Sequence, residues 1–538
     1  MDRTHRKLFA ILLLSWGLFL AVQSGLATDE TEHCHVAWLI GHEHQKPMRD
    51  FFQHHQPPLW DVLQLYFRLG ADGPEVLYFG RAVVLICTGL SVLAFFLLPW
   101  RLARRDNPES PLLWMAGALS LFPLILFSLI FGNILVIRPE ILSMPLFLYS
   151  LLLWLPGSKI STQHRLITHT FLAGVLVGAA IYTSPRFVFL GPAFFLLPAN
   201  RSRLFEVDFR RMPILAGGAL AFVVLYSVLM SHSLSEIFLN IEFARVLRPV
   251  GEGYFESATP LLTLMLLFSL LLVFLSRFST DHGKKRLLCQ SIFGLWLLGI
   301  VQLADWPYMY EHHFLLLALW WGVMTATVGV DFRPECRPPI PFLVTIGAVG
   351  GILLCLANGA SDIVSTSTIV DRVQLKRAIL ARIKKRDRVL FGAAAHPISA
   401  LDVSYYNNPI ADSPGRLATA VRLAQARRPL PDCDYVADIR TKHPALVGAS
   451  LLSAVGNAES QALKEVLRDY DRISIRANPR GSLICLVYTL KSTALIPSNT
   501  SPSVPMCRVA SVKPQPDRRV VLSSSSARSS PSLQRIPR

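Results

Sequence analysis

The stretch "VLYFGRAVVLICTGLSVLAFFLL", Val76–Leu98, holds one charged side chain, Arg81, in an otherwise largely apolar run. A membrane-spanning helix needs about 20 mostly apolar residues, so this segment is predicted to cross a membrane. An arginine at membrane depth is costly in free energy and usually faces a partner or an anion. The segment therefore predicts a helical membrane protein and indicates a polar site near its own start.

The composition of the whole chain agrees with a membrane protein. Of its 538 residues, 52% are hydrophobic and only 17% are charged, against about 25% charged residues in soluble domains. The net charge of +17 would suit a nucleic-acid partner, but the basic residues cluster in short stretches between apolar runs and near the C-terminus. We therefore expect membrane lipid, and no nucleic acid, as a partner.

Further apolar runs bring the predicted number of transmembrane helices to about eleven. The sequence therefore predicts a polytopic α-helical membrane protein. The candidate spans are Leu8–Leu26, Val76–Leu98, Leu112–Phe131, Ile141–Leu155, Ile167–Tyr182, Phe187–Pro198, Ile214–Met230, Leu261–Leu275, Ser291–Ala304, Phe314–Val330 and Phe342–Ala357. Several of these runs are short for a span, so tilted or shifted helices are expected among them.

The positions of lysine and arginine predict the orientation, because cytoplasmic loops carry an excess of both. The basic loops lie around residues 3–7, 101–105, 201–211 and 277–286. Their position puts the N-terminus inside, and residues 29–75 and the region after about 359 outside. The first run could instead be a cleaved signal peptide, since "SGLA" supplies small residues before Thr28. Cleavage would leave the orientation unchanged.

The chain is predicted to divide into three regions. These are a transmembrane domain at 1–358 with a long first outer loop at 29–75, a small extracytoplasmic α/β segment at 359–496, and a disordered tail rich in Ser, Pro and Arg at 497–538. The α/β segment is indicated by "VLRDYDRISI" and "SLICLVYTL", and the tail by its low hydrophobicity. Cys433 and Cys485 could form a disulfide if the segment is exported. His396, in "AAAHPIS", is interpreted as a residue at the end of a strand.

The outward loops gather polar side chains, whereas the opposite loops are only basic. The first outward loop begins with "TDETEHCH" (Thr28–His35), where Asp29 and Glu30 would repel each other unless a cation or a substrate proton lies near. Its six histidines have spacings that match no known set of metal ligands. Shorter outward loops carry "IRPE", "YTSPR" and "DWPYMYEHH". This asymmetry predicts an active or binding site on the outer face.

Five of these features occur in an order that resembles the GT-C glycosyltransferases, membrane enzymes that use polyprenyl-phosphate sugars. They are the acidic pair, "DFFQHHQPP" (Asp50–Pro58), the early Arg81, "RPE" and "PYMYEHHFLLL". The branch that the chain resembles contains lipopolysaccharide-core galacturonosyltransferases and is related to aminoarabinose and protein O-mannosyltransferases. The resemblance runs from about Leu8 to Lys491 and implies a GT-C-like fold.

The resemblance also implies roles for single residues. Asp29 matches the catalytic acid of the first loop, and Glu30 matches the second member of the pair. The positions implied to meet the lipid-linked phosphate are Arg81, Arg138 and Arg186, and those implied to shape the cleft are Asp50, His54, His55, Tyr310, Glu311 and His312. Ser184 stands where some relatives have lysine, which leaves Arg186 as the one cation of the third loop.

The implied reaction transfers a sugar from a polyprenyl-phosphate donor to a lipid, glycan or protein acceptor on the outer face of the membrane. Asp29 would act as general base, with inversion at the anomeric carbon. A divalent cation, Mg²⁺ or Mn²⁺, held by Asp29 or Glu30 could share the charge of the phosphate, but the reaction does not require one. The implied location is a bacterial inner membrane, with the active site and the C-terminus facing the periplasm.

Two other functional classes stay open. Outward histidines and arginines within the membrane would also suit a transporter or flippase for an anionic lipid or small molecule. Transporters often show two similar halves, which this sequence does not. A non-catalytic membrane scaffold is the third reading, and it predicts that Asp29 and Glu30 tolerate substitution.

Overall fold

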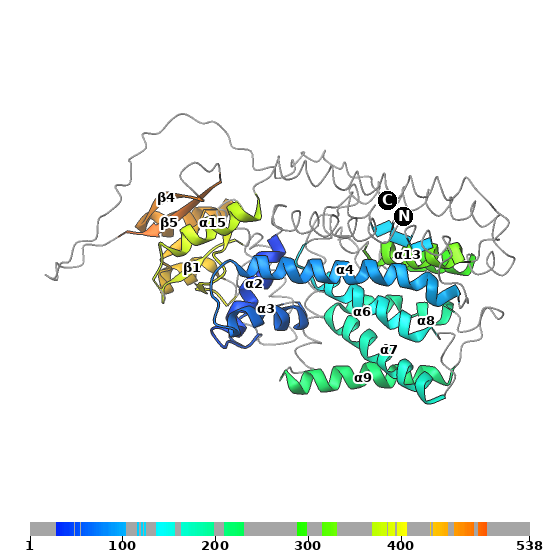
Figure 1. Ribbon diagram of the computed structural model, residues 1–538. Helices are drawn as coiled ribbons and strands as arrows, with labels where there is room; N and C mark the ends of the chain where they lie inside the picture. The colour runs from blue at the N-terminus through cyan, green and yellow to red at the C-terminus, as the bar shows by residue number, and fades with distance from the viewer. Residues whose placement is uncertain are drawn as a thin grey trace, which may run out of the picture. The chain divides into compact units, whose positions relative to one another are not determined.

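The structure is a computed structural model (Figure 1). It describes residues 28–47, 49–53, 55–103, 116–117, 120–121, 123–124, 136–155, 163–197, 209–230, 288–297, 315–330, 368–384, 386–392, 395–405, 431, 434–449, 457–477 and 483–491.

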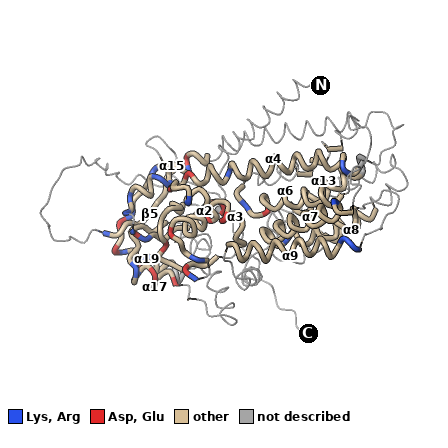
Figure 2. Tube along the Cα trace, turned by 60° about the horizontal axis from the view of Figure 1, so that its bottom comes forward, with Lys and Arg blue, Asp and Glu red and all other residues tan. Residues whose placement is uncertain are grey.

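A bundle of apolar helices makes up most of the described chain. Its elements are α2 (Thr28–Gly41), α3 (Pro58–Arg68), α4 (Val76–Ala103), α6 (Pro139–Trp154), α7 (Gln163–Thr183), η2 (Pro185–Leu190), α8 (Ala193–Leu196), α9 (Arg211–Leu229) and α13 (Leu315–Val330). Figures 1 and 2 show α4, α6, α7 and α9 side by side in that order.

The long helices have the length and the surface of membrane spans. Among the described residues, α4, α7 and α9 are long and apolar enough to cross a membrane, and α6 and α13 are shorter apolar helices. Large apolar side chains such as Ile86 of α4 and Leu220 of α9 are exposed, as expected for a surface that faces lipid. Acidic residues gather instead around α2, α3 and the C-terminal strands (Figure 2). The chain is therefore a helical membrane protein.

Small residues allow α7 and α9 to pack backbone against backbone. A Cβ atom at Gly174 would lie 2.1 Å from the carbonyl oxygen of Leu215, and one at Gly218 would lie 2.3 Å from the carbonyl oxygen of Phe171. Close approach at small residues is the usual way for helices to associate in lipid, where burial of apolar surface gives no driving force.

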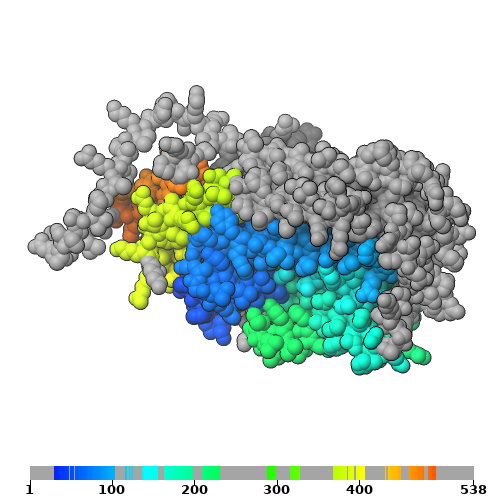
Figure 3. All heavy atoms as spheres, in the orientation of Figure 1, coloured from blue at the N-terminus to red at the C-terminus, as the bar shows by residue number. Residues whose placement is uncertain are grey.

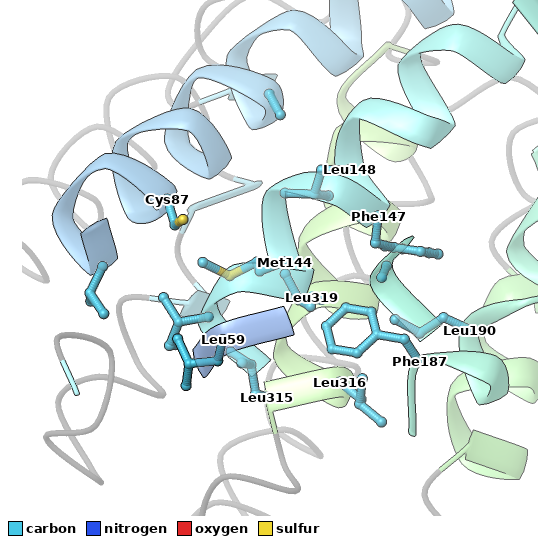
Figure 4. Packing of buried hydrophobic residues seen from close by; sticks show 14 of the residues in the cluster. Leu59, Cys87, Met144, Phe147, Leu148, Phe187, Leu190, Leu315, Leu316 and Leu319 are labelled. Atoms are coloured by element: carbon cyan, nitrogen blue, oxygen red, sulfur yellow. The ribbon is translucent and has the colours of Figure 1, made fainter. Parts of the chain in front are cut away.

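The core of the bundle lies where α6, η2 and α13 meet (Figure 4). Phe147 and Phe187 form an edge-to-face pair with ring centroids 5.9 Å apart, and both side chains are fully buried. Leu190, Leu316 and other leucines fill the space around them. This packing fixes α6, whose N-terminus carries part of the candidate site.

Two elements differ from the sequence prediction. The first outer region, expected as a loop over 29–75, contains two helices, α2 and α3. The sixth candidate span, Phe187–Pro198, is a 3-10 turn followed by a single helical turn, with a break at Gly191 and Pro192. Proline lacks the backbone N–H that a continuous helix would need at this point.

The count of eleven spans remains a prediction, because several candidates lie outside the described residues. Outside them lie all of Leu8–Leu26, Leu261–Leu275 and Phe342–Ala357, most of Leu112–Phe131, and the second half of Ser291–Ala304. The predicted domain boundaries near 358 and 496 also lie outside them.

Residues 368–491, called the α/β region below, form a mixed five-stranded sheet with flanking helices. The elements are α15 (Ile369–Leu380), β1 (Arg388–Leu390), β2 (Leu401–Asp402), α17 (Tyr435–Lys442), β3 (Leu446–Gly448), α19 (Asn457–Val466), η8 (Leu467–Asp469), β4 (Tyr470–Arg476) and β5 (Ile484–Leu490). The strand order is β2-β1-β3-β5-β4. β1 pairs in parallel with β2 and β3, and β5 pairs antiparallel with β3 and β4. Helix α15 begins with a capping box of Thr368 and Asp371, which satisfies backbone N–H groups at its first turn.

The α/β region packs against α2, α3 and α4. Ile369, Val373 and Ile398 belong to the same buried apolar cluster as the helix bundle, and Figure 3 shows this region, in yellow, directly against the blue N-terminal helices. Glu75, just before α4, pairs with Arg377 of α15. The thiol of Cys485 on β5 is free and buried, and Cys433, the partner considered for it, lies outside the described residues.

Candidate functional site

The first turn of α2 carries two neighbouring carboxylates, and each is paired with its own arginine. An oxygen of Asp29 lies 2.8 Å from a terminal nitrogen of Arg138. The guanidinium of Arg81 donates two hydrogen bonds to Glu30, at 2.5 and 2.6 Å. The repulsion that the sequence predicts for adjacent carboxylates is therefore relieved by two separate cations.

The two pairs differ in burial. The side chains of Glu30 and Arg81 are 0% and 1% exposed, whereas Asp29 is 34% exposed and Arg138 is 14% exposed. Opposite charges that are buried, bidentate and hydrogen-bonded satisfy one another. Only Asp29 of the two acids presents an oxygen that a substrate could reach.

The sealed pair also fixes the backbone beside the open pair. The N–H of Ile137 donates to Glu30 at 3.0 Å, and Ile137 precedes Arg138 in the chain. Arg138 is the N-cap residue of α6, which starts with proline at its first position, a placement that suits proline because the first N–H of a helix has no helical acceptor. The "RPE" sequence thus places Arg138 at the N-cap of α6, next to Asp29.

Arg138 keeps donor capacity beyond its pair with Asp29. Its Nε and Nη1 atoms are buried, and neither has a hydrogen-bond partner in the part of the chain that the structure describes. Buried donors of this kind are rare and usually indicate a bound water, ion or ligand oxygen. A planar guanidinium with two spare donors is well suited to a phosphate group.

Arg186 reaches the same end of α6 from the turn after α7. Its Nη1 donates to Glu140 at 3.2 Å, and Glu140 lies two residues after Arg138. The first turn of α6 therefore carries two acid–arginine pairs, Asp29 with Arg138 and Glu140 with Arg186. Of the three predicted arginines, Arg81 and Arg138 meet the first turn of α2, and Arg186 meets the first turn of α6.

Glu32, which the predicted site residues do not include, lies one turn further along α2. Burial, and then the nearby charge of Asp29, raises the pKa of its carboxyl well above the usual value. The ring of His55 lies 3.8 Å from this carboxylate and next to the ring of His33, with centroids 4.8 Å apart. The predicted cleft residue His55 is thus placed beside the first turns of α2.

Asp50 lies elsewhere in the outer region. It pairs with Arg49 at 2.6 Å, and a hydrogen bond from Arg49 lowers the pKa of the Asp50 carboxyl despite some burial. Together with Glu43, Lys442 and other residues it lines a cavity of about 260 Å³ between the outer loop and the α/β region. The other predicted cleft residues, His54, Tyr310, Glu311 and His312, lie outside the described residues.

The described residues around Asp29 offer few ligands for a resident Mg²⁺ or Mn²⁺. Both oxygens of Glu30 accept hydrogen bonds from Arg81, and Asp29 faces the guanidinium of Arg138. Hard divalent cations need several free oxygen ligands, so this pair fits one poorly.

A second buried polar cluster joins α2 to the α/β region. It consists of His35, His396 and Asp402, whose nitrogen and oxygen atoms lie within 4.8 Å of one another. The sequence offered no sign of it, because His35 and Asp402 are separated by 367 positions.

Comparisons with known proteins show the fold. No protein-family model matches the sequence, and no curated protein matches it. The structure is similar to that of ArnT from Cupriavidus metallidurans bound to undecaprenyl phosphate, with a TM-score of 0.59 and 10% sequence identity over 92% of this chain and 100% of that one. The apo state of the same protein gives a TM-score of 0.54 at 11% identity, over 90% of this chain and 98% of that one. The chain is thus a helical membrane protein that shares its fold with ArnT from Cupriavidus metallidurans, in line with the GT-C-like fold that the sequence resemblance implies.

Proposed function

We propose that the chain transfers a sugar from a polyprenyl-phosphate donor to a hydroxyl group of an acceptor at the outer face of a bacterial inner membrane. The observation that carries the proposal is the open pair of Asp29 and Arg138 beside a sealed pair of the same residue types. The likeness to a structure bound to undecaprenyl phosphate supports a lipid-phosphate donor.

Sugar transfer from a lipid phosphate is a displacement at the anomeric carbon. The acceptor oxygen forms a bond to this carbon, and the bond from the carbon to the phosphate oxygen breaks. The acceptor hydroxyl must lose its proton, and a positioned carboxylate that takes it contributes roughly 10²–10⁴-fold to the rate. Asp29 is the accessible carboxylate, and attack on the face opposite the phosphate gives inversion.

The phosphate gains negative charge as it leaves, and a fixed cation lowers the free energy of that transition state. Arg138 suits this role, because two of its nitrogens have no hydrogen-bond partner among the described residues and could donate to phosphate oxygens. Arg186, which pairs with Glu140 in the first turn of α6, adds positive charge to the same end of that helix. In this proposal arginine takes the place of a metal ion at the phosphate.

Glu30 and Arg81 have a different part in the proposal. Both are sealed from solvent, so neither touches substrate. They act as positioning residues that hold the first turn of α2 against α4 and fix the N–H of Ile137. Roles for Glu30 as a second acid and for Arg81 as a phosphate ligand, which the resemblance implies, are not part of the proposal.

The test is a transfer assay with purified protein in lipid nanodiscs. A panel of radiolabelled undecaprenyl-phosphate hexoses and pentoses serves as donor, and a lipid extract of the bacterial envelope serves as acceptor. Asp29→Asn and Arg138→Ala are compared with Asp471→Asn and Arg472→Ala, two exposed changes on β4. We expect transfer of one panel sugar by the wild type and both controls, and a loss of about 10²-fold or more in the site variants. Transfer by Asp29→Asn at the wild-type rate would overturn the assignment.

The same assay separates the proposal from a flippase. A flippase would move labelled donor between leaflets without releasing undecaprenyl phosphate. Release of this lipid phosphate together with labelled acceptor supports transfer, whereas movement of intact donor alone contradicts it.

A further inference from the structure

The cluster of His35, Asp402 and His396 is fully enclosed where α2 meets the α/β region. The side chains of both histidines are 0% exposed, and that of Asp402 is 6% exposed. His35 Nε2 lies 2.7 Å from one oxygen of Asp402, and His396 Nε2 lies 3.1 Å from the other. Such a set could hold a metal ion or could be a hydrogen-bonded ion pair, and the backbone contacts of the two rings distinguish these possibilities.

His396 cannot be a metal ligand in this arrangement. The backbone N–H of Ile398 donates to His396 Nδ1 at 3.0 Å, so Nδ1 carries no proton. A neutral imidazole then has its proton on Nε2, and this N–H donates to Asp402. A nitrogen that bears a proton has no lone pair for a metal.

His35 is placed between two acceptors. Its Nδ1 lies 2.6 Å from the carbonyl oxygen of Ile398, and its Nε2 faces the carboxylate of Asp402. A carbonyl oxygen can only accept, and a neutral imidazole has a single N–H. Both contacts are hydrogen bonds only if His35 carries two protons or if Asp402 is protonated.

The surroundings favour an ionised Asp402. Burial alone would raise its pKa, but the charge and the hydrogen bonds of His35 and His396 hold the pKa of this carboxyl below its usual value. Burial, followed by repulsion from His35, lowers the pKa of His396 to about 4, which keeps that ring neutral. With Asp402 ionised, the two contacts of His35 are both hydrogen bonds only when its ring carries two protons.

Backbone strain at Ile398 shows that the arrangement is imposed by its surroundings. Ile398 is fully buried and has a φ of 71°, a left-handed conformation that is unfavourable for a β-branched residue. This conformation lets its N–H and its C=O serve His396 and His35 at once. Strained residues persist where other contacts over-determine them.

We propose that doubly protonated His35, held by Asp402 and Ile398, clamps α2 to the α/β region and thereby positions Asp29. The proposal rests on the proposed function for its effect on rate. Helix α2 is then fixed at two places. The ion pair of Glu30 and Arg81 holds it to α4, and the bond of His35 to Asp402 holds it to the α/β region. Asp29 and His35 are six residues apart, about 9 Å along a helix.

Other titratable groups border the clamp. Lys376 of α15 donates to the carbonyl oxygen of His396 at 2.6 Å, and Cys34 of α2 is buried next to His35 in the sequence. The hydrogen bond from Lys376 therefore holds the turn that carries His396 against α15.

The direct test is nuclear magnetic resonance of the full chain in nanodiscs with ¹⁵N-labelled histidine, with His35→Gln used to assign the signal. We expect both ring nitrogens of His35 to carry protons at neutral pH, and no change in the His35 and His396 signals on addition of ZnCl₂. A His35 ring with one bare nitrogen, or saturable displacement of ring protons by Zn²⁺, would overturn the clamp.

Positioning is tested by hydrogen exchange and by kinetics. Asp402→Asn offers one acceptor oxygen in place of two, so one histidine loses its bond. We expect exchange of the α2 amides to rise about tenfold while α7 is unchanged, and kcat for sugar transfer to fall with KM unchanged. The fall in kcat should be smaller for His35→Gln, whose side-chain amide can replace the Nε2 donor, than for His35→Phe. Unchanged α2 exchange in Asp402→Asn contradicts the proposal. If the wild type transfers no sugar but its His35 is doubly protonated, the proposed function fails and the clamp stands.

Discussion

Asp29 and Glu30 are neighbours in the sequence, and each is paired with an arginine, yet their surroundings are opposite. Asp29 with Arg138 lies at a surface that substrate can reach, whereas Glu30 with Arg81 is closed off from solvent. Helical geometry causes the difference, because successive residues point about 100° apart around a helix of 3.6 residues per turn. The direction in which the helix turns each carboxylate, and not its residue type, therefore decides which of the two a substrate could reach.

The largest expected effect on stability comes from breaking the sealed pair. Glu30→Gln leaves Arg81 buried without its carboxylate, and loss of one partner from a buried ion pair costs about 3–5 kcal/mol. The midpoint of thermal unfolding in nanodiscs measures this loss, with Asp471→Asn as the exposed control. Adding Arg81→Met to Glu30→Gln removes the stranded charge and should recover most of the stability. A double variant as unstable as Glu30→Gln alone would show that the unpaired charge of Arg81 is not the cause of the lost stability.

A smaller effect is expected at Lys376. Its side chain is buried, and its Nζ donates a hydrogen bond to the carbonyl oxygen of His396. Burial, followed by the charge of Arg372, lowers its pKa from 10.5 to about 7. Between these values the unfolded chain binds more protons than the folded one, so stability should rise as the pH increases from 7 to 10.5. Lys376→Met should remove this rise and gain on the order of a few kcal/mol at pH 7. The measurement is the unfolding midpoint across that pH range, and a profile in the variant that matches the wild type would contradict the prediction.

The smallest of these effects is expected at the open pair. Arg138→Lys keeps the positive charge but loses the planar donor fork, so we expect kcat to fall by about tenfold, or about 1.4 kcal/mol. The comparison is with Arg472→Lys on β4. Equal rates for Arg138→Lys and wild type would mean that charge alone, without a second donor, serves the phosphate.

Parts of this site could be predicted from one sequence. An arginine in an apolar run, Arg81, indicated that a partner or an anion must face it, and the acidic pair indicated the need for nearby cations. Which acid meets which arginine could not be predicted, because Glu30 and Arg81 are 51 positions apart. The pairing depends on how α2 lies against α4.

Helix α2 itself was missed for a physical reason. Every residue from Glu30 to Leu39 is buried, so the helix has no side that faces solvent and lacks the periodic apolar stripe that usually indicates a helix. Its charged residues indicated an outer loop instead. His35 likewise carried no signal, since its partners are supplied by a distant turn.

In the proposed mechanism the exposed acid, Asp29, takes the proton, and the sealed acid, Glu30, holds the structure. The most direct measurement is the single-turnover rate of sugar transfer in nanodiscs for Asp29→Asn and for the folded double variant Glu30→Gln with Arg81→Met. We predict that Asp29→Asn loses about 10²–10⁴-fold while the double variant stays within about tenfold of the wild type. Wild-type transfer by Asp29→Asn, or an equal loss in a correctly folded double variant, would contradict the account.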